Sequence, residues 1–120
     1  MILRWGPAVA WAALIFFLSS LSVLPAAPPG ITDKHAHAAV YAVLGAALVW
    51  GLTDRSPHRT TWTTVAVVIL AATIYGVSDE GHQAFVPGRE VSVYDLAADA
   101  AGASAAAVGL RAWAIIRARR

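Results

Sequence analysis

Ionisable and amide side chains gather between residues 78 and 99, directly beside long apolar runs. This stretch is SDEGHQAFVPGREVSVYDLAAD, and its polar groups include Asp79, Glu80, His82, Gln83, Arg89, Asp95 and Asp99. In a membrane, such groups cost about 2.5 to 3.5 kcal/mol each at mid-depth, so they usually face a protein interior, a wet cavity or the interface. We therefore expect the chemistry of this chain, if it has any, to lie in this stretch.

Paired carboxylates in a low-dielectric pocket suit general acid–base catalysis on an ester or phosphoester, because one of the pair retains its proton. The predicted catalytic residues are Asp79, Glu80, Asp95 and His37, with His37 as the base. The alternative is a structural network in which Lys34 and Arg89 neutralise acids and tie the helix ends together. Two cations against six carboxylates would leave several acids uncompensated, which favours a bound cation, protonation or exposure to solvent.

The same carboxylates and imidazoles are ligand types that suit Zn²⁺, Mn²⁺ or Mg²⁺. However, no closely spaced ligand motif such as H-E-x-x-H is present, and the chain contains no cysteine. We therefore predict no metal ion and no other cofactor. His35 and His82 are expected to be interfacial or hydrogen-bonded side chains rather than ligands.

The composition indicates a single membrane domain. The 120 residues are 58% hydrophobic and only 13% charged, which is too apolar for an ordinary soluble domain of this size. The basic residues flank apolar segments instead of forming an aromatic, nucleic-acid-binding surface, so we expect no nucleic-acid partner. Without cysteine, thiol nucleophiles and disulfide frameworks are excluded.

Four apolar segments predict an all-α polytopic protein with four transmembrane helices in a bundle. The predicted spans are residues about 5–24, 34–52, 62–85 and 93–116. The first holds no charge over a length of about 30 Å, which favours a retained span over the alternative of a cleaved signal peptide. Proline-containing segments at 24–30, 53–61 and 86–89 predict the loops between them.

Local signals refine the expected helix starts and contacts. Thr32 or Asp33 is expected to cap the second helix, and Ser92 the fourth, with Asp95 completing a capping-box-like pair. Small residues recur every four positions in the fourth helix at Ala98, Gly102 and Ala106, and such a face lets helices approach closely in lipid.

The charges divide between the two ends of such a bundle. One end would carry seven arginines against Asp54 alone, and the other would carry Lys34 and Arg89 against six acids. Because positive residues in short loops stay in the cytoplasm, both termini are predicted to be cytoplasmic and the acidic end to face outward. The arginine-rich tail from Arg117 is expected to anchor the topology and to meet anionic lipid.

Helical spacing places further polar groups at the acidic end. Asp33, His37 and Tyr41 share one face of the second helix, and a four-helix bundle with short loops would bring them near the acids of the other helices. Arg89, on a Pro-Gly turn, could hold a phosphate or carboxylate, or could equally bridge helices through a salt bridge. The predicted substrate-binding residues are Asp33, Lys34, Tyr41, Gln83, Arg89 and Asp99.

These residues resemble the VanZ-like family of small bacterial membrane proteins, which is named for a protein linked to teicoplanin resistance. Asp33-Lys34 with His37 and Tyr41 is similar to the family motif D-K-x-x-H-x-x-x-Y. The stretch from Asp79 to Arg89 is similar to D-E-x-x-Q-x-F-x-P-G-R, and Phe17-Leu18-Ser19-Ser20 to the end of the first helix of the family. Two positions depart from the pattern: Ala38 stands where Phe is common, and Asp99 where Asn is usual.

The resemblance implies a multi-pass protein of the bacterial cell membrane that takes part in cell-envelope biology. The leading hypothesis is an outward-facing pocket that binds, or acts on, a cell-envelope or lipid-linked intermediate, with an effect on teicoplanin tolerance. The alternatives are an oligomeric ion or proton carrier, in which Asp99 relays a cation from Asp95, and a scaffold for envelope enzymes. Membrane lipid is the expected partner, and neither the oligomeric state nor enzymatic activity follows from these residues.

Overall fold

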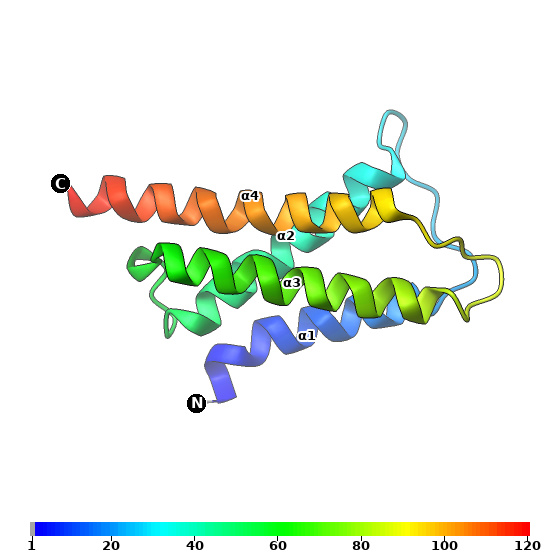
Figure 1. The fold of residues 1–120 in the computed structure, drawn as a ribbon, viewed down its shortest axis with the longest axis horizontal. Coiled ribbons are helices and arrows are strands. Elements are labelled where there is room, and N and C mark those ends of the chain that lie inside the picture. The colour runs from blue at the N-terminus through cyan, green and yellow to red at the C-terminus, as the bar shows by residue number, and fades with distance from the viewer. Residues whose placement is uncertain (1) are drawn as a thin grey trace.

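The computed structural model describes residues 2–120, and these residues form four long α-helices and one short 3₁₀ helix (Figure 1). The elements are α1 (Ile2–Ser19), α2 (Asp33–Leu52), η1 (Pro57–Arg59), α3 (Trp62–Gln83) and α4 (Val93–Ala118). The predicted all-α fold is confirmed. Both termini and the α2–α3 connection lie at one end of the bundle, and the other two connections lie at the opposite end (Figure 1).

Hydrogen bonds from side chains fix where α2 and α3 begin. The Thr32 hydroxyl accepts a hydrogen bond from the His35 amide, and the His35 ring accepts one from the Thr32 amide. Thr61 and Thr64 form the same reciprocal arrangement at the start of α3. Thr32 is therefore the cap of α2, as one of the two predicted alternatives, and His35 serves this cap.

The capping box predicted for the fourth helix is wrong. Ser92 stands at the N-cap position of α4, but its side chain makes no capping hydrogen bond. The Asp95 carboxylate instead contacts Lys34 on α2, and the Ser92 amide donates to Glu80 Oε2 at 3.1 Å. Partners on other helices have replaced the local ones.

The first helix ends earlier than its apolar run. The run continues to Leu24, but α1 ends at Ser19, and Leu21 closes a tight turn through a bond from its amide to the Leu18 carbonyl. The Arg89 guanidinium donates to the carbonyls of Leu18, in the last turn of α1, and of Leu21, just after it, so these acceptors are satisfied without a further helical turn. The helix therefore ends five residues before the predicted end of the span.

The surface and the interior are distributed as expected for a protein in lipid. Large apolar side chains such as Phe17, Leu70 and Ile74 are about 60% exposed, whereas the interior holds small residues and several acids. Helices α1, α2 and α3 are long and apolar enough to cross a membrane. The protein is thus a helical, multi-pass membrane protein, and the crossing of α4, which is richer in alanine and glycine, stays a prediction.

Small residues bring α2 and α4 into backbone contact. A Cβ atom at Gly45 would lie 2.9 Å from the Ala103 backbone, and a Cβ atom at Gly102 would overlap the Ala38 carbonyl. The predicted close contact at Gly102 is confirmed, but the fully buried alanines of α4 are Ala103 and Ala107 rather than Ala98 and Ala106. The packed face is therefore turned slightly from the predicted one.

Tryptophan and arginine side chains gather at the end of the bundle that carries the termini. Three guanidinium groups lie over indole rings, namely Arg4 over Trp5 (5.6 Å), Arg111 over Trp62 (5.7 Å) and Arg117 over Trp113 (5.4 Å). Aromatic residues and cations favour the membrane–water interface. This belt marks the level at which we expect that end of the bundle to leave the lipid.

Replacing Gly102 by alanine should destabilise the fold, because its Cβ would strike the α2 backbone, where no flexible side chain can yield. Overpacking of this kind costs about 1 to 3 kcal/mol. Titration with sodium dodecyl sulfate in mixed micelles would measure the free energy of unfolding. Gly109→Ala is the matched control, since nothing lies within 4 Å of its added Cβ. Equal stability of the two variants would contradict the close contact.

Candidate functional site

A ring of polar side chains closes the end of the bundle opposite the termini. It is built from the first turns of α2 and α4, the last turns of α3, and the loop between α3 and α4 (Figure 1). These segments are far apart in the sequence but adjacent in the antiparallel bundle. Polar residues stand at the ends of the helices on this side, and the connections 20–32 and 84–92 join these ends.

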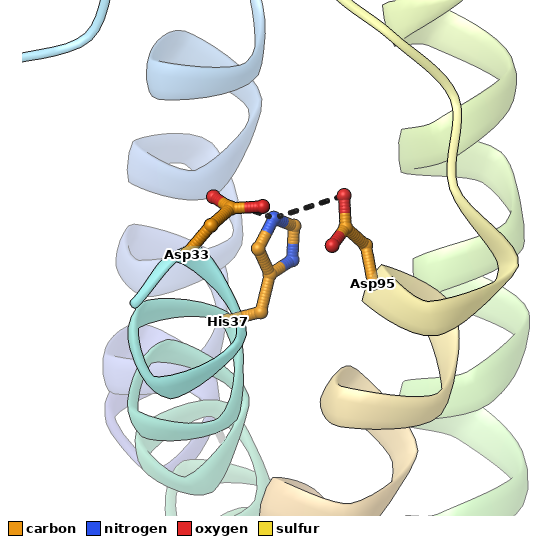
Figure 2. Close-up of side chains that lie close together, drawn as sticks. All are labelled: Asp33, His37 and Asp95. Atoms are coloured by element: carbon orange, nitrogen blue, oxygen red, sulfur yellow. Dashed lines mark ion pairs between the residues drawn. The ribbon is translucent and has the colours of Figure 1, made fainter. Parts of the chain in front are cut away.

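His37 lies at the centre of the ring. Its Nδ1 is 2.8 Å from Asp99 Oδ1, and its Nε2 is 3.7 Å from Asp95 Oδ2 and 3.8 Å from Asp33 Oδ1. Figure 2 shows the imidazole on α2 between the carboxylates of Asp33 and Asp95. One ring therefore joins acids of α2 and α4, and a positive charge on it would be shared among three carboxylates.

Lys34 supplies the permanent positive charge beside this histidine. Its Nζ lies 3.3 Å from Asp33 Oδ2 and in direct contact with Asp95 Oδ1. Asp95 is almost fully buried, whereas Lys34 is about half exposed. Of the predicted ion-pair network, the pair of Lys34 with Asp95 is thus present, and it joins α2 to α4.

Three polar residues of α3 turn inward and each reaches another helix. Asp79 Oδ2 accepts from the Tyr41 hydroxyl at 3.4 Å, and Gln83 Nε2 donates to Ser19 Oγ at 2.8 Å. Glu80 Oε2 accepts from the Ser92 amide. These side chains bind α3 to α2, to α1 and to the start of α4, respectively.

Several buried carboxylate oxygens nevertheless lack a partner. Asp79 Oδ1, Glu80 Oε1 and Asp99 Oδ2 accept no hydrogen bond from any residue between 2 and 120. All three side chains are at least nine-tenths buried. An unpaired buried acceptor costs about 1 to 3 kcal/mol, and more when it is charged, so these oxygens call for a proton or a ligand.

Arg89 does not neutralise the acids. Its Nη1 donates to the carbonyls of Leu18 at 3.3 Å and of Leu21 at 3.1 Å, and within residues 2–120 it forms no ion pair. The alternative in which Arg89 bridges helices to Asp79, Glu80 and Asp95 is therefore wrong. The turn explains the difference, because Gly88 adopts a positive φ of 81° and leads the chain toward the end of α1.

Two adjoining pockets open beside this ring. A pocket of about 130 Å³ has mainly apolar walls from Ile15, Leu18, Leu24 and Val40, with Asp33, His37, Tyr41, Asp79, Gln83 and Arg89 among its polar lining. A second, of about 370 Å³, is mainly polar and is lined by Lys34, Glu90, Ser92 and Asp95, among others. The two share the wall formed by Leu24, Asp33, His37, Gln83 and Arg89.

The structure brings all ten predicted site residues to this end of the bundle, and their catalytic or binding roles stay predictions. Lys34, Asp33, His37, Asp95 and Asp99 form one contact network. Tyr41, Asp79, Glu80 and Gln83 line its α3 side, and Arg89 covers the pockets from the loop.

Sequence reasoning noted Ser19 in the family-like end of the first helix and Ser92 as a cap, but it missed the contacts that both make at the site. Ser19 bonds to Gln83, and the Ser92 amide to Glu80. His82 lies outside the ring, where its Nε2 is 2.9 Å from Ser20 Oγ and its ring stacks on Phe16, as expected for a hydrogen-bonded interfacial side chain.

The fold and this site define a multi-pass helical membrane protein with an acidic, histidine-containing polar site at one end of its bundle. The chain belongs to the VanZ/LLP1 family, whose match covers residues 4–116 and so almost the whole chain. The resemblance drawn from the motifs is thereby confirmed. No curated protein and no solved structure matches this chain.

Ser19→Ala should lower the free energy of unfolding by about 1 to 3 kcal/mol, because it leaves the buried Gln83 amide without its acceptor. Changing Gln83 to Met in the same variant should restore much of that loss, since both polar partners are then gone. The same detergent titration measures both changes. Ser104→Ala, which removes a hydroxyl bonded only within α4, is the control and should have a smaller effect.

Proposed function

We propose that this VanZ-like protein binds the anionic, phosphate-bearing head group of a lipid-linked cell-envelope intermediate. The observation that carries the proposal is the position of Arg89. Its guanidinium is held by backbone carbonyls instead of carboxylates, so its charge remains for a ligand. Guanidinium groups bind phosphate and carboxylate oxygens in pairs, which gives both strength and direction.

The two pockets support an amphipathic ligand. Arg89 and His37 lie in the wall between a mainly apolar pocket and a mainly polar one. A lipid-linked molecule has the same division, with a chain that prefers apolar walls and a head group that needs polar ones. We place the head group in the polar pocket and the first part of the chain against Ile15, Leu18 and Val40.

The acids beside Arg89 extend the proposal from binding to reaction. His37 and Asp95 line the pocket proposed for the head group, and Asp79 lines the adjoining apolar pocket. A carboxyl or imidazole there could exchange a proton with a phosphoester oxygen. We also propose an effect on teicoplanin tolerance. This effect would follow if the protein binds an envelope intermediate at the outer face of the bacterial cell membrane.

Arg89→Gln should weaken binding of polyprenyl phosphate by about tenfold or more, since a hydrogen bond to a charged group contributes about 1.5 to 3 kcal/mol. Native mass spectrometry of the detergent-solubilised protein would measure the affinity. The control is Arg59→Gln, an exposed arginine at the other end of the bundle. Glutamine can still donate to the Leu18 and Leu21 carbonyls, so the loop should keep its place. Equal affinities for the three proteins would contradict the proposal.

The proposed orientation has both termini in the cytoplasm. It is supported by the gathering of seven arginines and four tryptophans near the terminal end, because positive loops stay inside and aromatic residues lie at interfaces. The acidic site would then open outward, where envelope intermediates are assembled.

Single cysteines can test this orientation without background, since the chain contains no cysteine. A membrane-impermeant maleimide should label Glu90→Cys in intact cells, because Glu90 is exposed on the site loop. His58→Cys, exposed in the α2–α3 connection, should be labelled only after the cells are opened. The reverse pattern, or labelling of both in intact cells, would refute the orientation.

A further inference from the structure

Close to the ion pair of Lys34 and Asp95, three helices each contribute one side chain that can bind a metal ion. His37 of α2, Glu80 of α3 and Asp99 of α4 each offer a ligand atom within 4.8 Å of the others. We propose that these three residues hold a divalent transition-metal ion, Zn²⁺ or Mn²⁺. This inference goes beyond the binding of a head group and does not depend on it.

Unpartnered oxygens in this cluster point to a ligand. Glu80 Oε1 and Asp99 Oδ2 have no hydrogen-bond partner in the described chain, although Glu80 is 5% and Asp99 0% exposed. The Glu80 carboxylate is held by its other oxygen, which accepts from the Ser92 amide, and so presents Oε1. Asp99 Oδ1 lies 2.8 Å from His37 Nδ1, so these two groups are close enough to bind one ion together.

The nearby protein cations do not compensate this charge. Lys34 contacts Asp33 and Asp95, and Arg89 contacts backbone carbonyls. Asp79, one residue before Glu80, adds a further unpartnered oxygen. Buried carboxylates that lack a counterion are costly, and a bound divalent ion supplies the missing charge.

The ring of His37 can present one nitrogen to a metal and the other to carboxylates, which is the usual division in a metal-bound histidine. Its Nδ1 lies 2.8 Å from Asp99 Oδ1. Its Nε2 lies 3.8 Å from Asp33 Oδ1 and 3.7 Å from Asp95 Oδ2, which are ion-pair rather than hydrogen-bond distances (Figure 2). In the proposed site Nδ1 binds the metal, and Nε2–H faces these two outer carboxylates.

The donor types select the metal. Imidazole suits Zn²⁺ and other transition metals, while carboxylates also suit Mn²⁺, and all-oxygen sites are the usual choice of Ca²⁺ and Mg²⁺. One nitrogen with two carboxylates therefore favours Zn²⁺ or Mn²⁺. The absence of a local motif does not oppose this, because each ligand comes from a different helix and only the fold unites them.

Metal analysis of the purified protein tests the site. Protein in detergent is stripped with a chelator, equilibrated with Zn²⁺ or Mn²⁺, desalted and analysed for bound metal by mass spectrometry. We expect one ion per chain and a higher midpoint of thermal unfolding. Asp99→Asn and Glu80→Gln should each weaken binding at least about tenfold, a change of 1.4 kcal/mol.

Glu90→Gln is the matched control, because it removes an exposed acid from the same end of the bundle without touching the three ligands. Co²⁺ gives a second measurement that needs no variant, since its visible absorption should show nitrogen and oxygen coordination in the wild-type protein. Failure of the wild type to bind any of the three metals would overturn the proposal. Binding that is unchanged in both ligand variants would overturn it as well.

The experiment separates this inference from the proposed function. Arg89→Gln should keep the metal while losing affinity for polyprenyl phosphate. A wild-type protein that binds polyprenyl phosphate but no metal would refute only the metal site. One that binds metal but no polyprenyl phosphate would refute only the head-group proposal.

Discussion

The burial of carboxylates among closely packed helices is the constraint on which this structure depends. Asp79, Asp95 and Asp99 lie almost out of contact with solvent, in an interior where a charge without a partner is strongly unfavourable. Each acid therefore reaches across to another helix, and His37 of α2 is the partner that Asp95 and Asp99 of α4 share. The interactions that hold the helices together at the end opposite the termini are thus the interactions that form the site. In this protein, the same contacts stabilise the fold and set the geometry of the site.

The distance between His37 and Asp99 follows from a glycine one turn away. Gly102 lets the α4 backbone meet the Ala38 carbonyl, and no residue with a Cβ could keep that separation. His37 precedes Ala38, and Asp99 lies three residues before Gly102, so the close approach places imidazole and carboxylate 2.8 Å apart. Larger residues at this contact between α2 and α4 would move His37 and Asp99 apart and would let lipid or water enter between them. Small residues in the membrane thus act on the site through the helix spacing they allow.

Much of the fold could be predicted because it follows from local patterns. Uncharged runs, the Thr32 cap and the proline-containing loops identify the helices, and motif spacing identifies the family. The errors concern groups with several possible partners. Asp95 could cap its own helix or bind Lys34, and Arg89 could bind acids or carbonyls. The sequence shows which partners are available to each group. Which partner the group contacts depends on distances between residues remote in the chain, and only the packed bundle fixes these distances.

The two ends of the bundle use cations in opposite ways. At the terminal end, guanidinium groups lie over indole rings, where they suit the membrane interface and have few acids to neutralise. At the other end, acids outnumber cations, and the one arginine is turned toward the carbonyls of α1. Had Arg89 paired with Glu80 or Asp99, its charge would be used by that carboxylate and would not remain for a ligand at the pocket wall. Its hydrogen bonds to the Leu18 and Leu21 carbonyls, at and just after the end of α1, leave the buried acids without this cation and keep its positive charge at the pocket wall. An anionic head group and a metal ion would each require this separation of charge.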